Sequence, residues 1–327
     1  MLRNVFLLSA PFVALLASYF ALDPFHVLYH YPKFDKPLLA IPNRDYISTQ
    51  MYLNTYEKRP YQSFIVGNSR TLAFSIRDWV PYIQDTLAFH YDASGESLYG
   101  VWKKLQFVEQ HHSPLKNVLL ICDAELLAKT DDSPSHLFRK DPRITGEHPL
   151  PFQFTFLKAY SSNLFFYHFI MLRTTGHFTS GMAGMLESRR VYFDPVTNDL
   201  SLPDINKEIR KDSVGFFTRN AALKTARKPS TGTAVIGPAQ LRQLVAIRNI
   251  FTRHRTNYRI VISPLFNQTQ INPADIAQLQ RVFAADRIHD YSGVNAFTAN
   301  LSNYYEDSHY RPLVGNAILR QIYAPVK

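Results

Sequence analysis

The stretch SFIVGNSRTLAF, residues 63–74, decides which fold this chain is expected to adopt. Ser63–Val66 is short, apolar and β-rich, which predicts a buried strand. Gly67 ends that run, and Ser69 follows where a helix can begin. A serine at such a place either caps the helix with its side chain or presents its hydroxyl as a nucleophile at the edge of a sheet.

Strand-like runs alternate with helix-like runs on both sides of a middle segment. Further strands are expected within residues 86–95, 116–122, 258–265 and 287–293, and helices within residues 97–112, 238–254, 273–285 and 312–323. Strands that alternate with helices in this way predict a parallel sheet covered on both faces. We therefore expect an α/β fold with a three-layer arrangement.

The N-terminal segment Val5–Leu22, VFLLSAPFVALLASYFAL, contains no charged residue. As a helix it would be about 27 Å long, close to the thickness of the hydrocarbon core of a bilayer. Arg3 and the terminal amine place this end in the cytoplasm, so that about 300 residues would lie outside the cytoplasmic membrane. We favour a retained signal anchor over a cleaved signal peptide, because no clear cleavage site follows.

Two segments interrupt the expected alternation. Residues 23–60 are rich in Pro and Tyr without a sustained period, which is typical of an extended stalk or of a wrap over the following domain. Residues 61–327 would form that domain. Within it, residues 130–230 are rich in Pro, Ser, Thr, Arg and aromatic side chains and are expected to be an insertion or cap, with a helix over residues 156–178.

Composition and charge narrow the classes of function. With 46% hydrophobic and 19% charged residues, the chain is globular and not disordered. The net charge of +10 is spread without a basic block, which favours anionic lipid or an acidic polymer over nucleic acid as a neighbour, although a merely basic surface is an alternative. The lone Cys122 excludes an internal disulfide and lies in an apolar run typical of a buried strand. His111 and His112 lack the spacing of metal ligands, and we expect no metal and no cofactor.

The carboxyl ends of parallel strands meet at one edge of a sheet, where sites form. There the N–H of Ser69 would lie at a helix N-terminus and favour an oxyanion. Gly95, after the second strand, would offer a second N–H or serve as an ordinary turn glycine. Asp290 and Tyr291 end the last strand and would either line the pocket or form a turn.

His309 lies in a loop just before the expected final helix, within NYYEDSHYRPLVGNAIL, residues 303–319. Glu306 and Asp307 precede it closely, and a carboxylate at this spacing can hold a histidine in the tautomer of a general base. The alternative is a surface or structural histidine, of which a chain with twelve has several.

Taken together, these segments resemble the SGNH (GDSL-like) hydrolases. That family carries a Gly-Asp-Ser-type block after its first strand, an oxyanion glycine after the second, and a D-x-x-H block before its C-terminal helix. The likeness extends over residues 60–129 and 233–325 and is strongest to the membrane-anchored extracytoplasmic branch, which includes the D-alanyl transfer protein of teichoic-acid synthesis and alginate-acetylation proteins. It implies a sheet of the SGNH-hydrolase (flavodoxin-like) type.

The resemblance also implies roles for individual residues. Ser69 would be the nucleophile and His309 the base, with Gly95 and the Ser69 N–H as oxyanion donors. Either Glu306 or Asp307 would orient the histidine.

Three departures from the family pattern stand beside these roles. Asn68 replaces the common Asp and is expected, with Arg70, to bind substrate or to support the oxyanion; for Arg70 a structural ion pair is the alternative. Glu306 stands where the family has Asp. After the third strand the chain reads Cys122-Asp123-Ala124-Glu125 in place of G-x-N-D, which removes one oxyanion donor, typically worth about 3 kcal/mol of transition-state stabilisation.

By this resemblance the chain is an extracytoplasmic serine acyl-ester hydrolase or O-acyltransferase, in which an acyl group on Ser69 passes to water or to a glycan hydroxyl. It would act in acylation of a cell-envelope polysaccharide or teichoic-acid-type polymer, beside a membrane-bound O-acyltransferase. The alternative is a catalytically weak or inactive accessory module that keeps the fold and binds a polymer or a transferase. A nucleic-acid partner is not expected, because no binding motif is present.

Overall fold

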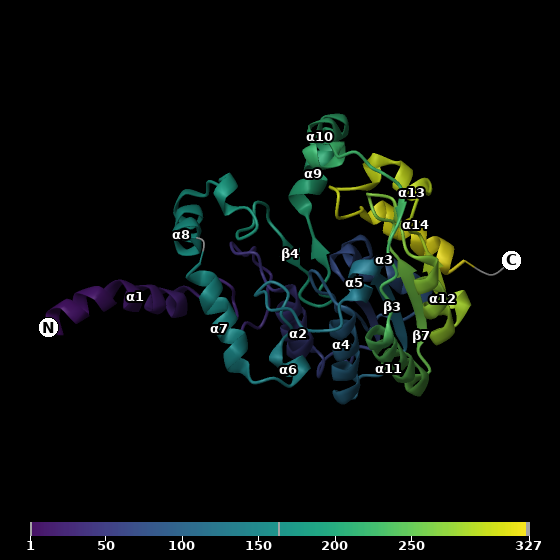
Figure 1. Ribbon diagram of the computed structural model, residues 1–327, viewed down its shortest axis with the longest axis horizontal. Helices are drawn as coiled ribbons and strands as arrows, with labels where there is room; N and C mark the ends of the chain where they lie inside the picture. Colours follow the sequence, from purple (N-terminus) through teal and green to yellow (C-terminus); the bar gives the residue numbers. More distant parts are fainter. Residues whose placement is uncertain (1, 163, 325–327) are drawn as a thin grey trace.

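The computed structural model describes residues 2–162 and 164–324, with side chains from Ala10 onward. At its centre is a five-stranded parallel sheet with the strand order β2-β1-β3-β7-β9 (Figure 1). The strands are β1 (Ser63–Gly67), β2 (Ala88–His90), β3 (Asn117–Cys122), β7 (Asn257–Ile262) and β9 (Ile288–Asp290). The predicted α/β class and its parallel sheet are confirmed. Residues 325–327 of the predicted domain lie outside the described residues.

Both faces of the sheet are buried under helices, as a continuously apolar parallel strand requires. Ile65, Leu119 and Val261 point to one face, where α3 (Ile76–Ile83) and α14 (Pro312–Ile322) pack. Neighbouring residues of the same strands, such as Phe64 and Leu120, point to the other face. That face is covered by α2 (Arg44–Thr55), α4 (Leu98–Gln110), α11 (Pro238–His254) and α12 (Pro273–Val282).

The order of the strands creates a crevice at the site edge. From β1 the chain first moves outward to β2 and then returns past β1 to β3, and such a reversal leaves an opening at the carboxyl ends of the two central strands. The 3₁₀ helix η1 (Ser69–Ala73) follows β1 there, and α5 (Ala124–Ala128) follows β3.

Gly67 explains why the opening stretch breaks on glycine. Its φ is +143°, and a Cβ at this position would lie 2.1 Å from the carbonyl oxygen of Ile121 in β3. A residue with a side chain would therefore push β1 away from β3 at the point where the chain turns into η1 and toward Ser69.

The N-terminal helix α1 (Leu2–Leu22) contains the predicted anchor, residues 5–22, whose side chains at 5–9 lie outside the described residues. Within the described part of the chain, no helix combines the length and the apolar character needed to cross a membrane. The C-terminal end of α1 is held to the domain by Ser18, whose hydroxyl lies 2.8 Å from that of Tyr160.

The segment between α1 and β1 is folded and not an exposed stalk. Asn43 caps α2 by accepting a hydrogen bond from the N–H of Tyr46, and Ile47, Met51 and Tyr52 of this helix are buried in the core. Residues 23–60 thus belong to the same core as the domain that follows them.

The insertion is built from short elements on the side of the molecule where α1 joins it and above the sheet edge (Figure 1). These are α6 (Pro142–Thr145), α7 (Pro149–Tyr160), α8 (Phe165–Thr175), η2 (Ser180–Met182), the hairpin of β4 (Tyr192–Phe193) and β5 (Leu200–Ser201), α9 (Pro203–Lys211), α10 (Ser213–Arg219) and η3 (Ala221–Lys224). The remaining short elements are β6 (Ser230–Thr231), β8 (Thr269–Gln270), η4 (Ala285–Arg287), α13 (Ala296–Ala299) and η5 (Leu301–Asn303).

The single helix expected over residues 156–178 is wrong. The chain forms α7 and α8 instead, and the first of them ends at Tyr160. The hydroxyl of Ser161 donates to the carbonyl of Leu157, and that of Ser162 donates to the carbonyl of Lys158. Such local bonds compete with the helical ladder and favour a helix end.

Candidate active site

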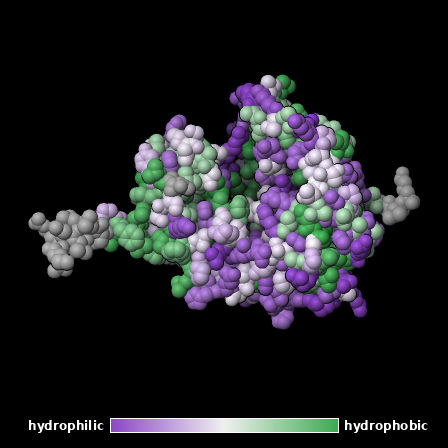
Figure 2. Space-filling view, in the orientation of Figure 1, coloured by the Kyte–Doolittle hydropathy of each residue, from purple (hydrophilic) through white to green (hydrophobic). Residues whose placement is uncertain are grey.

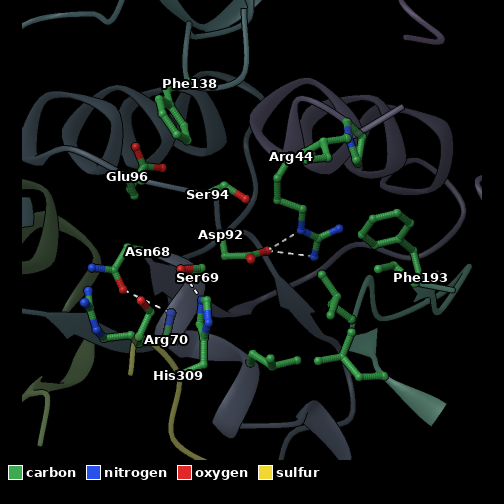
Figure 3. A pocket seen from close by; sticks show the side chains of 18 of the residues that line it. Arg44, Asn68, Ser69, Arg70, Asp92, Ser94, Glu96, Phe138, Phe193 and His309 are labelled. Atoms are coloured by element: carbon green, nitrogen blue, oxygen red, sulfur yellow. Dashed lines mark hydrogen bonds and ion pairs between the residues drawn. The ribbon is translucent and has the colours of Figure 1, made fainter. Parts of the chain in front are cut away.

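Ser69 and His309 meet at the carboxyl end of β1, although they are 240 residues apart in the sequence (Figure 3). The Oγ of Ser69 lies 2.8 Å from Nε2 of His309. Ser69 is the first residue of η1, so its N–H is among the donors that a helix leaves without an internal partner. One residue therefore presents a hydroxyl to a base and carries an N–H that has no acceptor within η1.

The other ring nitrogen of His309 contacts a carboxylate. Nδ1 is hydrogen-bonded to Oε1 of Glu306, which fixes Nδ1 as the donor and leaves Nε2 to accept the proton of the Ser69 hydroxyl. Burial alone would raise the pKa of Glu306, but the hydrogen bond and the charge of His309 outweigh it and hold this pKa below its usual value. Glu306 is thus kept ionised beside the imidazole.

Asp307, the second candidate for orienting the histidine, faces elsewhere. It is exposed, and its Oδ1 accepts a hydrogen bond from the hydroxyl of Ser308. Of the two acids next to His309 in sequence, the structure brings Glu306 to the imidazole.

Two buried tyrosines hold the loop that carries Glu306 and His309. Tyr304 and Tyr310 form an antiparallel bridge across its base. The hydroxyl of Tyr304 donates to the carbonyl of Pro264, and that of Tyr310 lies 3.3 Å from the hydroxyl of Ser263, just after β7. The loop is therefore fastened to the sheet edge before α14 begins.

Asn68 and Arg70, on either side of the serine, form a network with Asp123. The side-chain oxygen of Asn68 accepts from the N–H of Arg70, and its amide donates to Asp123 at 2.5 Å. Arg70 Nη1 lies 2.7 Å from the same carboxylate, which is only 2% exposed. Asp123 also caps α5 by accepting from the N–H of Leu126. Arg70 thus makes the structural ion pair that was one of its two expected roles, and this network shapes the turn around Ser69.

Gly95 lines the same cavity as Ser69 and His309, with a φ of +56° that favours glycine. The next residue, Glu96, is buried and forms ion pairs with Lys104 and Lys140. Lys140 comes from the insertion, and Asp45 of α2 approaches both lysines, at 3.0 and 3.3 Å. A buried group of charges from three parts of the chain therefore fixes the Gly95 loop.

The cavity has a volume of about 430 Å³, and part of its wall comes from segments that sequence reasoning did not connect to the site. It is lined by Ile41, Pro42, Arg44, Asn68, Ser69, Arg70, Leu72, Asp92, Ser94, Gly95, Glu96, Glu125, Phe138, Glu187, Val191, Phe193, Leu200, Leu202, Ser308 and His309. Arg44 pairs with Asp92 at 2.7 Å and lies over the ring of Phe193 (Figure 3). The helix that bears Arg44 could have been found from Asn43 as a cap and Asp45 in the first turn.

Glu187, which lines the cavity, is a carboxyl group with a raised pKa. It lies in the insertion among apolar lining residues such as Val191, and burial raises its pKa to about 7. No sequence signal marked this residue, because its surroundings come from a segment without regular periodicity.

Asp290 and Tyr291 are not among the residues that line the cavity. The Asp290 carboxylate accepts from the N–H of Ser292, and Tyr291 packs against Phe297, so both act as turn and core residues. In the part of the chain that the structure describes, no group of three or more His, Cys, Asp or Glu side chains is placed to hold a metal ion. Cys122 is buried, which raises the pKa of its thiol.

No protein-family model matches this chain, and comparison with curated proteins gives no match either.

Proposed function

We propose that this chain is an extracytoplasmic serine acyl-ester hydrolase or O-acyltransferase of the SGNH type. One observation carries the proposal: the hydroxyl of Ser69 lies 2.8 Å from Nε2 of His309, whose Nδ1 is hydrogen-bonded to Glu306. A nucleophile, a base and an orienting acid in this relation support attack on a carbonyl carbon.

The reaction follows from these positions. Ser69 Oγ attacks the acyl carbonyl while its proton passes to His309 Nε2, and the N–H groups of Ser69 and Gly95 stabilise the oxyanion. Collapse of the tetrahedral intermediate breaks the ester bond, and the imidazolium gives its proton to the departing alkoxide. Water or a glycan hydroxyl then attacks the acyl-enzyme, with His309 as base, and Ser69 is released as a hydroxyl.

The setting follows from the resemblance alone, whereas the strand order supports the type of fold. If the five strands of the central sheet are numbered 1 to 5 along the sequence, the order β2-β1-β3-β7-β9 becomes 2-1-3-4-5. This is the strand order of flavodoxin-like folds. We propose that residues 5–22 anchor the chain in the cytoplasmic membrane and that the domain faces the extracytoplasmic side. Its substrate would be a cell-envelope polysaccharide or teichoic-acid-type polymer, acylated in concert with a membrane-bound O-acyltransferase.

A second candidate is an accessory module that binds polymer or transferase without turnover. The observation that favours it lies at the end of β3, where Ala124 stands in place of the oxyanion asparagine of the family and the neighbouring Asp123 is paired with Arg70. Loss of one such donor typically costs about 3 kcal/mol of transition-state stabilisation.

Turnover of p-nitrophenyl acetate by the full chain tests the proposal. Ser69→Ala should lower kcat/KM by at least about 1,000-fold, while Ser213→Ala, at an exposed position on α10, should leave it unchanged. Equal turnover by Ser69→Ala and wild type would refute the mechanism. Absence of turnover in the wild type, together with binding of an envelope polymer, would favour the accessory module.

A further inference from the structure

Large apolar side chains are exposed together on α7 and α8. Leu150 and Phe154 of α7 are 68% and 66% exposed, and Phe166 and Tyr167 of α8 are 36% and 57% exposed. We call these four residues the α7–α8 surface. Figure 2 shows the apolar colouring gathered at the end of the molecule from which α1 projects. Large exposed apolar patches on soluble domains mark sites of interaction with protein or membrane.

The inner faces of the same two helices are apolar as well. Phe152, Phe156 and Tyr160 of α7 and Phe165 and Phe169 of α8 are buried in one cluster. The core therefore uses one side of each helix, and the packing of the domain leaves the aromatic groups on the other side unexplained. A helix that is apolar on both faces is typical of burial or of contact with lipid.

The helices α7 and α8 also pack against the end of the N-terminal helix and the residues that follow it. The hydroxyls of Ser18 and Tyr160 lie 2.8 Å apart, and the rings of Tyr19 and Tyr160 are 5.2 Å apart. Beyond α1, Phe25 packs on Phe165 at 4.8 Å. Further up α1, Phe12 is 67% exposed. The end of α1 and the two helices thus form one unit, with exposed apolar groups on each part.

The charges of this region suit an anionic lipid surface. No Asp or Glu occurs from His148 to Leu186, whereas Lys158 and Arg173 lie in this stretch and are exposed. Interfacial helices combine aromatic and aliphatic groups that enter the acyl boundary with cations that remain among anionic headgroups. An apolar protein partner would give no reason for acidic residues to be missing over the whole segment.

We propose that the α7–α8 surface inserts into the headgroup boundary of an anionic bilayer, beside the point where α1 enters it. This second contact would fix the orientation of the domain to the membrane, because α7, α8 and the end of α1 share one packed cluster. The inference does not depend on the acyl chemistry, but it rests on the proposed location of the chain at a membrane.

Tryptophan probes in the full chain test it. The protein is reconstituted into phosphatidylcholine vesicles with about 30% phosphatidylglycerol, with and without brominated acyl chains. Phe154→Trp and Tyr167→Trp report on the surface, Phe12→Trp reports on α1, and Val294→Trp, 64% exposed in the loop after β9, is the matched control. Wild-type signal from Trp79 and Trp102 is subtracted, and an unchanged Tm shows that each variant folds.

We expect the added fluorescence at positions 154 and 167 to shift to the blue and to be quenched at least about two-fold by brominated lipid, with no change at position 294. Quenching of the Phe12 probe without quenching of the Phe154 and Tyr167 probes would overturn the proposed surface and leave an integral membrane protein as its partner. If no probe is quenched, the membrane location and this inference both fail. Hydrolysis of the soluble p-nitrophenyl ester is measured on the same samples and reports separately on the acyl chemistry.

Discussion

Gly315 in α14 lies directly against the carbonyl group of Ala73 in η1, and a Cβ at Gly315 would be 1.9 Å from that oxygen. The final helix and the turn that begins with Ser69 therefore touch backbone to backbone. Because His309 precedes α14 by a few residues, this contact places the histidine loop over the serine. Because Gly315 has no side chain, two segments from opposite ends of the domain can pack this closely.

We predict that Gly315→Ala lowers the free energy of unfolding by about 2–4 kcal/mol, although alanine alone would favour the helix by about 1 kcal/mol. The added methyl group must displace α14 from η1, so ester turnover should fall as well. Urea denaturation and turnover measure the two effects. Gly237→Ala is the control, because its nearest neighbour, Gln240 Oε1, is 3.5 Å from the added Cβ. Wild-type stability in Gly315→Ala would show that the close contact has no such role.

Glu306 and Asp307 offer a test within one loop. Glu306→Gln removes the charge that fixes the His309 tautomer, and we expect kcat to fall by about 100-fold or more. Asp307→Asn changes an exposed acid that accepts a hydrogen bond from the hydroxyl of its neighbour Ser308 and does not contact the imidazole of His309, and kcat should stay within about two-fold of wild type. Steady-state kinetics on both variants decides the matter. The reverse order of effects would assign the orienting role to Asp307.

Glu187 predicts a dependence of stability on pH. Burial raises its pKa from 4.5 to about 7, so the folded chain keeps a proton that the unfolded chain has already released in this range. The free energy of unfolding should therefore fall as pH rises from about 4.5 to about 7. Glu187→Gln has no carboxyl group to titrate, so its free energy of unfolding should not show this fall. The difference in that free energy, variant minus wild type, should be about 1–3 kcal/mol larger at about pH 8 than at about pH 4.

Urea denaturation of both proteins across that range measures the Glu187 effect. Glu57→Gln, at an exposed position in the turn after α2, serves as control and should show no such difference between the two pH values. If the free energy of unfolding differs between Glu187→Gln and wild type by the same amount at every pH, the Glu187 carboxyl is not desolvated in the folded chain.

The central sheet and its covering helices could be predicted from the sequence because buried strands and helices carry apolar residues in a regular pattern. Leu98, Val101, Leu105 and Val108 mark one face of α4, and all four are buried. Every strand of the sheet matches an expected run to within one residue at each end that extends past it, as Gly67 in β1 and Asn257 in β7 do, and α11 has the expected bounds. Ser69, Gly95 and His309 were also predicted to meet, since the carboxyl ends of parallel strands share one edge.

The other features of the site depend on contacts between residues far apart in the sequence, which no local sequence pattern indicates. Arg44 reaches the cavity only because α2 packs into the core, and its pairing with Asp92 is a long-range contact. The choice between Glu306 and Asp307 required the conformation of the loop, which Tyr304 and Tyr310 set from within the core. The insertion could be recognised by composition, but its aromatic residues gave no indication of which rings would be buried and which exposed.

Covalent labelling by a fluorophosphonate, with the modified residue located by mass spectrometry, tests most directly whether Ser69 is an activated nucleophile. We predict one adduct per chain on Ser69, formed by the native protein, abolished by heat denaturation, and slowed at least about 100-fold in His309→Asn. A native wild-type chain that forms no adduct, or that carries it on another residue, would contradict the proposed acyl-transfer site.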